Sequence, residues 1–136
     1  MSAPERPMKK EIIHTSNAAV TGAPLVQATK LGQLVFCSGC SPRDPRRGNA
    51  VVEGGFREQA TQAMENLKAV LEAAGSGFQH CLKATVYIVD IDRNLPIMNE
   101  IWVQYFGSDV PARTALGVSK LRENYMLEVE ATAYAP

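Results

Sequence analysis

The chain has 136 residues, of which 46% are apolar, a size and composition that fit one domain with a hydrophobic core. Lysine plus arginine and aspartate plus glutamate number 14 each, so no excess charge predicts binding to nucleic acid or to an anionic membrane. The opening residues lack the apolar run of a secretory signal, and no segment approaches the roughly 20 apolar residues of a membrane span.

The first half of the chain predicts three strands, a loop and a long helix. Residues 1 to 8, with two prolines and few apolar groups, are expected to be frayed. The stretch "KEIIHT" fits a short strand, and "LVQATKLGQLVFCSG" fits two strands that turn around Gly32. The polar stretch "SPRDPRRGN" predicts a loop. From residue 56 to 74 apolar residues recur at helical spacing, and Gly75 follows as a stop signal.

The second half alternates strands with one more helix. In "CLKATVYIVD" the alternation predicts one apolar face, made of Leu82, Ala84, Val86 and Ile88. A second helix is predicted from about residue 95 to 106, and two strands near residues 114 to 118 and 125 to 134. The order β-β-β-α-β-α-β-β predicts an α+β domain over residues 1–136: a single mixed β-sheet with two helices packed on one face.

The opposite face of this sheet is also expected to be buried. The stretch "LVFCS" is apolar on both sides, and in "YMLEVEATAY" the residues that alternate with the core set are mixed in polarity. A strand that is apolar on both faces in so small a protein predicts a further protein layer, most simply another copy of the chain. We therefore expect a homo-oligomer.

The stretch "CSGC" has the cysteine spacing of a zinc site or of a redox disulfide. A redox pair usually lies at a helix N-terminus, whereas Cys37 and Cys40 end a strand and precede Ser-Pro. A zinc site would need two further ligands, and Cys81, beside His80, has no partner at the usual spacing. We predict no metal site and interpret the spacing as a coincidence. Three cysteines, an odd number, favour a reducing compartment, so a cytoplasmic location is expected.

Two further stretches carry a family resemblance. In "VPARTALGV" a proline fixes the backbone just before Arg113, which opens a strand, and in "LEVEA" Glu128 lies on the less apolar face of the last strand. Together with "LVFCSG" and the two-helix order, they resemble the reactive intermediate deaminase family (RidA/YjgF), from about Ile12 to the C-terminus. The resemblance implies a chorismate-mutase-like homotrimer with active sites at subunit clefts. It also implies cofactor-free hydrolysis of 2-imino or enamine acids, released by pyridoxal-phosphate enzymes, to 2-oxo acids and ammonia.

The resemblance also implies roles for individual residues. Arg113 would hold the substrate carboxylate, since a planar guanidinium can grip it with two parallel hydrogen bonds, and Glu128 would position water. The iminium carbon is already electrophilic, so neither a covalent nucleophile nor a metal is needed. The backbone N–H of Ala115 would also contact the carboxylate, and Glu130 matches a second acidic position on the last strand. Ser38 and Gly39 match the family's Ser-Gly pair, and Asn99 matches its helix asparagine.

Each assignment has an alternative from the residues alone. Arg113 could be a structural ion-pair partner of Glu128 or Glu130 across an interface, and Asn99 could tether its helix to a loop. His14 and His80 match no catalytic position, and we interpret them as ordinary surface or hydrogen-bonded histidines. We interpret Asp90 and Asp92 as turn residues after the strand.

The chain departs from the family pattern at four positions. Leu25 stands where a site-lining tyrosine is common, and Ala115, Arg122 and Cys40 replace residues that are often cysteine, proline and glutamine. The loss of the tyrosine hydroxyl makes the entrance to the site more apolar. The sequence therefore leaves open a larger or less polar imine, or a pathway-specific deaminase of an aminated catabolic intermediate such as 2-aminomuconate.

Two functions of other classes also stay open. One is a non-catalytic member that binds small acids or acts as a chaperone. The other is a ribonuclease or translation inhibitor, an activity attributed to family members. The sequence gives little support to the ribonuclease function, because it contains neither a basic stripe nor a histidine pair suited to phosphoester cleavage.

Overall fold

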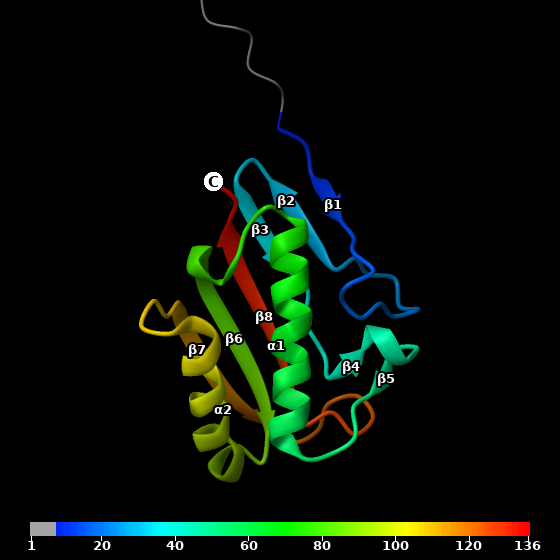
Figure 1. Ribbon diagram of the computed structural model, residues 1–136, viewed down its shortest axis with the longest axis vertical. Helices are drawn as coiled ribbons and strands as arrows, with labels where there is room; N and C mark the ends of the chain where they lie inside the picture. Colours follow the sequence, from blue (N-terminus) through cyan, green and yellow to red (C-terminus); the bar gives the residue numbers. More distant parts are fainter. Residues whose placement is uncertain (1–7) are drawn as a thin grey trace, which may run out of the picture.

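The computed structural model describes residues 8–136 and contains two long helices, a six-stranded sheet and a second, two-stranded sheet (Figure 1). The order of strands in the larger sheet is β1-β2-β3-β8-β6-β7, and all neighbours are antiparallel except β6 and β7. Its strands are β1 (Glu11–Ile13), β2 (Ala28–Leu31), β3 (Leu34–Cys37), β6 (Cys81–Val89), β7 (Ala112–Val118) and β8 (Leu127–Tyr134). The prediction of an α+β fold with a mixed sheet is confirmed. The expected frayed start falls, apart from Met8, outside the described residues.

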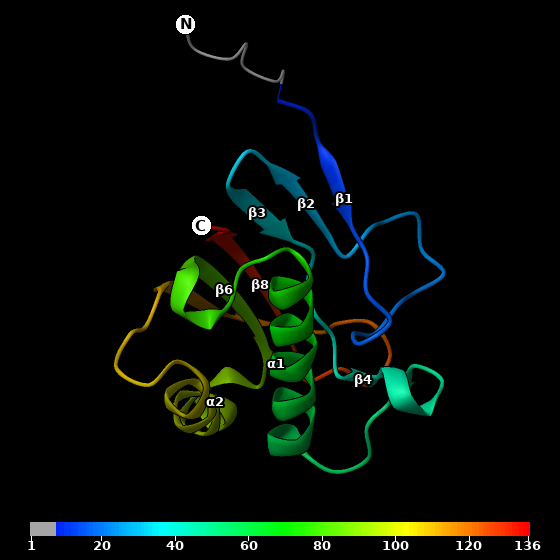
Figure 2. The same cartoon turned by 45° about the horizontal axis from the view of Figure 1, so that its top comes forward.

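Both helices lie on one face of the larger sheet (Figures 1 and 2). Helix α1 (Phe56–Ala73) crosses β3 and β8, and α2 (Ile91–Phe106) packs on β6 and β7. The apolar face of α1 is fully buried, as its spacing predicts, and Gly75 adopts the left-handed φ of 79° that ends the helix. The core between the layers includes Met64, Leu67 and Leu71 of α1 and Val35, Val86, Leu127 and Val129 of the sheet.

The second helix begins four residues earlier than predicted. Pro96 therefore lies inside α2, where it cannot donate the backbone hydrogen bond to the carbonyl of Asp92. Because this turn is on the exposed side of the helix, water can satisfy that carbonyl. Asp90 precedes the helix with a φ of 54°, whereas Asp92 lies within its first turn, so the expectation of two turn residues holds only for Asp90.

Leu82 is an exception to the predicted alternation of β6. Ala84, Val86 and Ile88 are buried as expected, but Leu82 is 47% exposed. The pairing of β6 with β8 shifts register between Cys81 and Lys83, and such an irregularity turns the side chain beside it to the other face. The predicted core position of Leu82 is therefore wrong.

The prediction of a single sheet is also wrong. The expected loop over residues 41 to 49 contains β4 (Arg43–Asp44), which pairs with β5 (Ala50–Val51) across a short 3₁₀ turn. The Asp44 carboxylate caps this turn by accepting a hydrogen bond of 2.9 Å from the N–H of Arg46. Two-residue strands are too short to show alternation, so the sequence carried no signal for them.

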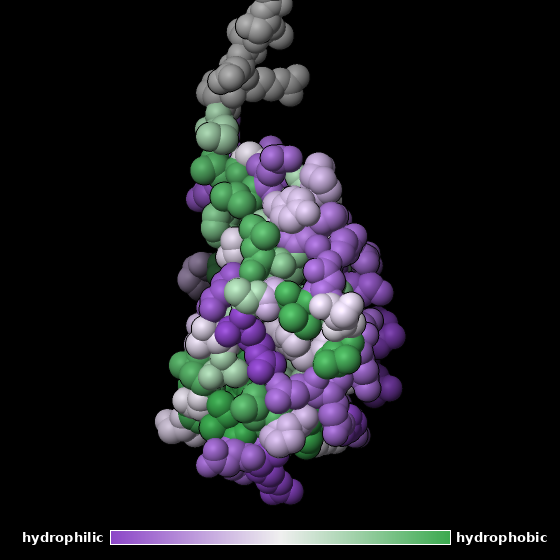
Figure 3. Space-filling view, turned by 90° about the vertical axis from the view of Figure 1, so that its left-hand side faces the viewer, coloured by the Kyte–Doolittle hydropathy of each residue, from purple (hydrophilic) through white to green (hydrophobic). Residues whose placement is uncertain are grey.

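The open face of the larger sheet carries hydrophobic side chains. In the register of β1, β2 and β3, the residues that share this face include Ile12, Leu31, Leu34 and Phe36, each at least 43% exposed. Seen from the β7 side, hydrophobic residues gather toward the open face, whereas hydrophilic residues predominate toward the helices (Figure 3). The apolar second face expected from "LVFCS" is therefore present. Within residues 8–136, neither long helix has the apolar length that crossing a membrane would need.

Candidate functional site

A cavity of about 440 Å³ opens beside Glu128, between the segment of residues 12–27, α1 and the chain that leaves β3. Four of the eight positions expected at the site line it, namely Leu25, Ser38, Gly39 and Glu128. The other four, Arg113, Ala115, Asn99 and Glu130, do not. The cavity falls in the size range of small-molecule sites.

A bulge at the end of β3 shapes one wall of the cavity. Phe36 pairs with Thr132, and the next bridge joins Cys40 to Val129, so that three residues, 37 to 39, lie opposite two residues of β8. Backbone hydrogen bonds close the bulge, from Cys40 N–H to Val129 O at 2.7 Å and from Val129 N–H to Cys40 O at 3.1 Å. Bulges of this kind re-aim backbone and side chains, and this one brings the Ser-Gly pair to the cavity.

Gly39 lets the Glu128 carboxylate lie directly against the backbone. A Cβ added to Gly39 would stand 2.7 Å from Glu128 Oε2, closer than any ordinary contact. Glu128 is half-buried, and this burial, followed by the charge of Glu130, raises the pKa of its carboxyl group. Glu130 is itself held by the Tyr87 hydroxyl, which donates a hydrogen bond of 2.7 Å to Oε1. The cavity thus contains a carboxylate that takes up a proton more readily than an exposed glutamate does.

Ser38 has a structural bond within the site. Its Oγ donates to the carbonyl of Val26 at 2.6 Å, and its N–H donates to the carbonyl of Gln27 at 2.9 Å. These bonds fix the bulge to the segment that carries Leu25. The Ser38 hydroxyl has therefore already used its proton, although its oxygen can still accept a hydrogen bond.

Arg113 lies on the other face of the sheet from Glu128. In the register, Arg113 pairs with Ala84 and Leu116 pairs with Tyr87, which in turn pairs with Glu128. Paired residues share a face, and Ala84 is buried under the helices, so Arg113 points to the helix side and Glu128 to the open side. Within one chain the two residues cannot meet, either as a catalytic pair or as an ion pair.

Helix α2 orients the Arg113 guanidinium. Its Nη1 donates to Asn99 Oδ1 at 2.9 Å, and its central carbon lies 5.2 Å from the centroid of the Trp102 ring. Asn99 is thus a partner of Arg113, and no hydrogen bond from its side chain to a loop is present in the described part of the chain. Arg113 forms no ion pair with a carboxylate of residues 8–136. Its charge remains available to an external anion.

Two side-chain amides that the sequence did not mark hold the cavity wall, the half-buried Gln27 and the buried Asn66. Gln27 Oε1 accepts from the N–H of Thr15 at 2.7 Å, and its Nε2 donates to the carbonyls of Thr15, Ala18 and Ala19. A single side chain therefore ties the segment before β2 into a loop. Its polar character within a strand-like stretch gave no indication of this role.

Asn66 of α1 joins the same loop to the chain after β3. Its Oδ1 accepts from the N–H of Ala19 at 3.2 Å, and its Nδ2 donates to the carbonyls of Ser41 and Arg43 at 2.9 and 2.8 Å. The sequence contained a signal for the role of Asn66, because polar residues recur at helical spacing along α1, and all three are buried: Gln59, Gln62 and Asn66.

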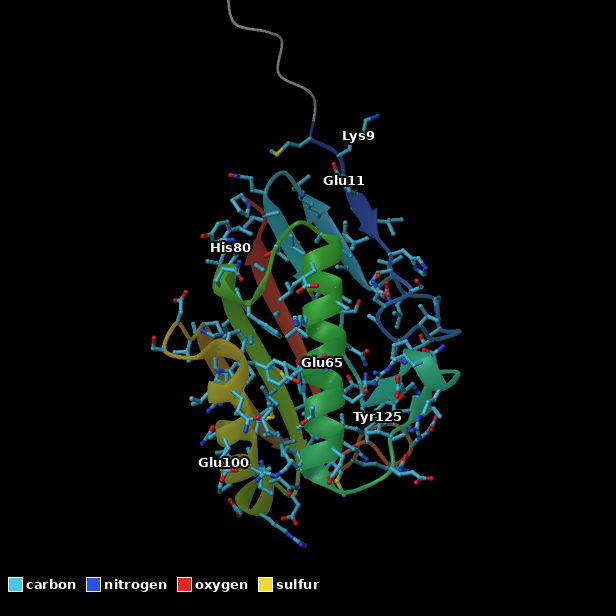
Figure 4. The ribbon with its side chains drawn as sticks, in the orientation of Figure 1. Lys9, Glu11, Glu65, His80, Glu100 and Tyr125 are labelled. Atoms are coloured by element: carbon cyan, nitrogen blue, oxygen red, sulfur yellow. The ribbon has the colours of Figure 1, made fainter. Side chains whose placement is uncertain are left out.

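A cluster of charged side chains adjoins the cavity at Tyr125 and Arg122. Tyr125 lies beside β4, where its hydroxyl accepts a hydrogen bond from Arg43 Nε (Figure 4). Arg43 also forms an ion pair with Glu123, whose carboxylate is 3.9 Å from Arg122 Nε. Arg122 and Tyr125 both line the cavity, although the sequence marked Arg122 only as a departure from the family pattern.

The three cysteines are buried free thiols. Burial, followed by the charge of Cys81, raises the pKa of Cys37 to about 12, and burial raises that of Cys81 to about 11. The pKa of Cys40, which lines the cavity, is also raised by burial. Thiols in such surroundings stay protonated at neutral pH and are poor nucleophiles. Among residues 8–136, no group of three or more histidines, cysteines or carboxylates is arranged to hold a metal ion.

The two histidines differ in their surroundings. His14 is exposed at the rim of the cavity. His80 packs against Tyr134 with the ring centroids 4.7 Å apart and the rings tilted by 53°, and its buried Nδ1 has no hydrogen-bond partner within residues 8–136. The expectation of an ordinary surface residue fits His14. The expectation of a hydrogen-bonded histidine is wrong at Nδ1 of His80.

Comparison with known proteins agrees with this fold. The family model described as endoribonuclease L-PSP matches residues 15–135. A RutC family protein of Pyrococcus horikoshii is 42% identical over 125 residues, which cover 92% of this chain and 98% of the relative. The human protein named 2-iminobutanoate/2-iminopropanoate deaminase is 37% identical over 124 residues, which cover 91% of this chain and 89% of that protein.

Solved structures give the same result. The crystal structure of E. coli TdcF with bound serine superimposes with a TM-score of 0.85 at 33% identity, covering 93% of this chain and 99% of the other. The matches extend over nearly the whole chain, in sequence and in structure, as the predicted resemblance requires. The chain belongs to the endoribonuclease L-PSP family, which includes the RidA/YjgF and RutC proteins.

Proposed function

We propose that this protein is a deaminase that hydrolyses 2-imino and enamine acids to 2-oxo acids and ammonia. The observation that carries the proposal is the half-buried Glu128 carboxylate, which lies against Gly39 in the cavity and has a raised pKa. A carboxylate in these surroundings can accept a proton from water near neutral pH. The name of the human relative, a deaminase of 2-iminobutanoate and 2-iminopropanoate, supports the same chemistry.

The complete site would need two copies of the chain, and we propose a homotrimer in which each site joins two subunits. Arg113 and Glu128 lie on opposite faces of one sheet, so a substrate that touches both must lie between chains. Two features support such an assembly. The open face exposes Leu34 and Phe36, and β7 is an edge strand whose outer backbone groups have no partner strand within residues 8–136.

In the proposed site, Arg113 of one subunit holds the substrate carboxylate. Asn99 and Trp102 fix the plane of its guanidinium, which favours two parallel hydrogen bonds to the two carboxylate oxygens. The backbone N–H of Ala115, two residues along the same edge strand, would add a third. This grip would place the imine carbon of the substrate beside Glu128 of the neighbouring subunit.

Glu128 would then move the protons of hydrolysis. It takes a proton from water as the water oxygen bonds to the iminium carbon, and the C=N double bond becomes a single bond in the resulting carbinolamine. The protonated carboxyl group gives its proton to the nitrogen, the C–N bond breaks, and ammonia leaves as the hydroxyl oxygen forms the ketone. The proton of that hydroxyl returns to Glu128 or to water. The proposed cycle balances with one water and no cofactor.

Cleavage of RNA is less compatible with the cavity. His14 is the only histidine in its lining, and much of the remaining wall is apolar. His14 and Glu128 could both transfer protons, but Arg122 is the one lysine or arginine among the described residues that line the cavity, whereas binding a polynucleotide backbone needs several cations along it. The geometry thus supports imine hydrolysis better than the activity in the family description.

The test is direct. Imines generated in situ by an amino-acid oxidase, with catalase present, are trapped by semicarbazide in competition with hydrolysis. We expect the protein to lower the rate of semicarbazone formation, and Glu128→Gln to abolish most of this effect while preserving the melting temperature. Wild-type protein that leaves semicarbazone formation unchanged for every imine would refute the proposed function.

A further inference from the structure

We propose that the cavity beside Glu128 receives the side chain of the 2-imino acid, and that the preferred substrates carry a large apolar side chain. The inference rests on the proposed function and specifies its substrate class. The same cavity disfavours two other classes of substrate, one with only a methyl side chain and one with a second carboxylate. Size, hydrogen bonding and charge of the cavity all favour the large apolar group.

The cavity is larger and more apolar than a methyl group requires. Its volume of about 440 Å³ would leave most of the space to water if the imine of alanine were bound. Aliphatic side chains from β1, the loop before β2 and α1 form much of its wall: Ile12, Ile13, Ala18, Ala19, Val20, Leu25, Val26 and Val70. Replacing water against such a wall by hydrocarbon is favourable.

Several polar side chains of the wall are already engaged within the protein. Gln27 uses its amide oxygen and nitrogen to hold the loop of residues 15–19. The amide of Asn66 is hydrogen-bonded to the backbone of Ala19, Ser41 and Arg43. The Ser38 hydroxyl proton is bonded to the carbonyl of Val26. A polar substrate side chain in this part of the cavity would lose its water and find few free partners, which is costly.

The charges disfavour a second carboxylate deep in the cavity. Glu128 is the acidic residue of the lining and would repel it. The cation of the lining, Arg122, has a side chain that is 65% exposed and lies close to Glu123. Arg122 therefore stays hydrated at the mouth, where it gives little compensation to an anion that has been desolvated inside.

The expected preference can be stated as a ratio. Each additional buried methylene group improves kcat/KM by about fourfold when it leaves water for an apolar wall. The leucine side chain adds three carbons to the methyl group of alanine, which gives roughly fiftyfold. We call this quotient of kcat/KM values the leucine-to-alanine ratio.

The experiment compares imines of alanine, leucine and glutamate, each generated by an oxidase of matching specificity and followed by semicarbazide competition. Leu25→Asn makes an exposed part of the wall polar and should lower the leucine-to-alanine ratio about tenfold, with little effect on stability because Leu25 is 55% exposed. The matched control is Val103→Asn, since Val103 is 59% exposed on α2 and does not line the cavity. This control should leave the ratio unchanged.

Calorimetric titration with the product acids keeps the inference testable if no imine is hydrolysed. We expect 4-methyl-2-oxopentanoate to bind more tightly than pyruvate or 2-oxoglutarate, and Leu25→Asn to remove the difference. A leucine-to-alanine ratio near one, a preference for the glutamate imine, or equal binding of the three acids would overturn the inference. Hydrolysis of all three imines without a preference would leave the proposed deaminase intact and refute only the substrate class.

Discussion

Mixing two inactive variants should restore activity, because the proposed site takes Arg113 and Glu128 from different chains. Arg113→Ala removes the carboxylate grip, and Glu128→Gln removes the base while keeping its shape. The strand register places the two side chains on opposite faces of the same sheet, so neither variant can repair its own site. A hetero-oligomer can, at an interface where each chain supplies the residue that the other lacks.

The size of the recovery follows from this geometry. Each single change should lower kcat/KM by about two to three decades, since loss of one side of a buried charge pair costs roughly 2 to 5 kcal/mol. In trimers assembled at random from equal amounts, an interface needs Glu128 from an Arg113→Ala chain and Arg113 from a Glu128→Gln chain. That combination occurs at about one interface in four, so the mixture should regain about a quarter of wild-type activity.

The assay is co-refolding of the two variants from denaturant, followed by imine hydrolysis at fixed total protein. Each variant refolded alone and wild-type protein refolded alone are the controls. Light scattering checks that all samples have the same oligomeric state. A mixture no more active than the mean of its components, although hetero-oligomers have formed, would refute the shared site. Single variants that both keep full activity would remove these residues from the mechanism altogether.

Three further predictions follow from the cavity and from the open face. Gly39→Ala should push the Glu128 carboxylate aside and lower kcat/KM about a hundredfold without unfolding the protein, whereas Gly22→Ala, with open space around its Cβ, should be silent in the same assay. Glu130→Gln should move the acid limb of the kcat/KM profile to lower pH. The charge of Glu130 adds to burial in raising the pKa of Glu128, so removing that charge should let Glu128 stay ionised at lower pH. An acid limb that stays in place or moves to higher pH would contradict this. Phe36→Lys should convert the proposed trimer to smaller species in light scattering, and an unchanged mass would show that this part of the open face is not an interface.

Local sequence was sufficient for the elements whose signals are periodic. Helix α1 follows its predicted bounds to within one residue, because an apolar residue recurs at nearly every turn and Gly75 ends the run. The alternation of β8 likewise gave the correct buried face from Leu127 to Ala133, and Tyr125, which precedes the strand, is also buried. In both elements a wide apolar face meets the core, so the pattern and the packing favour the same structure.

Local sequence failed where the deciding interaction is distant. Leu82 keeps the alternation of β6, but a register shift against β8 turns it outward. The second helix was predicted from about residue 95, yet it begins at Ile91 and tolerates Pro96 in its exposed first turns. Asn66 and Gln27 hold the cavity through bonds to residues as far as 47 positions away, and no pattern within the helix or the strand could name those partners.

The candidate site divides in the same way. The sequence alone determined which residue types are suited to the chemistry, because Arg113, Glu128 and the Ser-Gly pair stand in stretches that resemble a family pattern. Only the tertiary structure decided that Glu128, Ser38 and Gly39 meet in one cavity while Arg113 lies behind the sheet. The physical reason is that a side chain's face depends on the strand register, and the register is fixed by pairing between segments far apart in the chain.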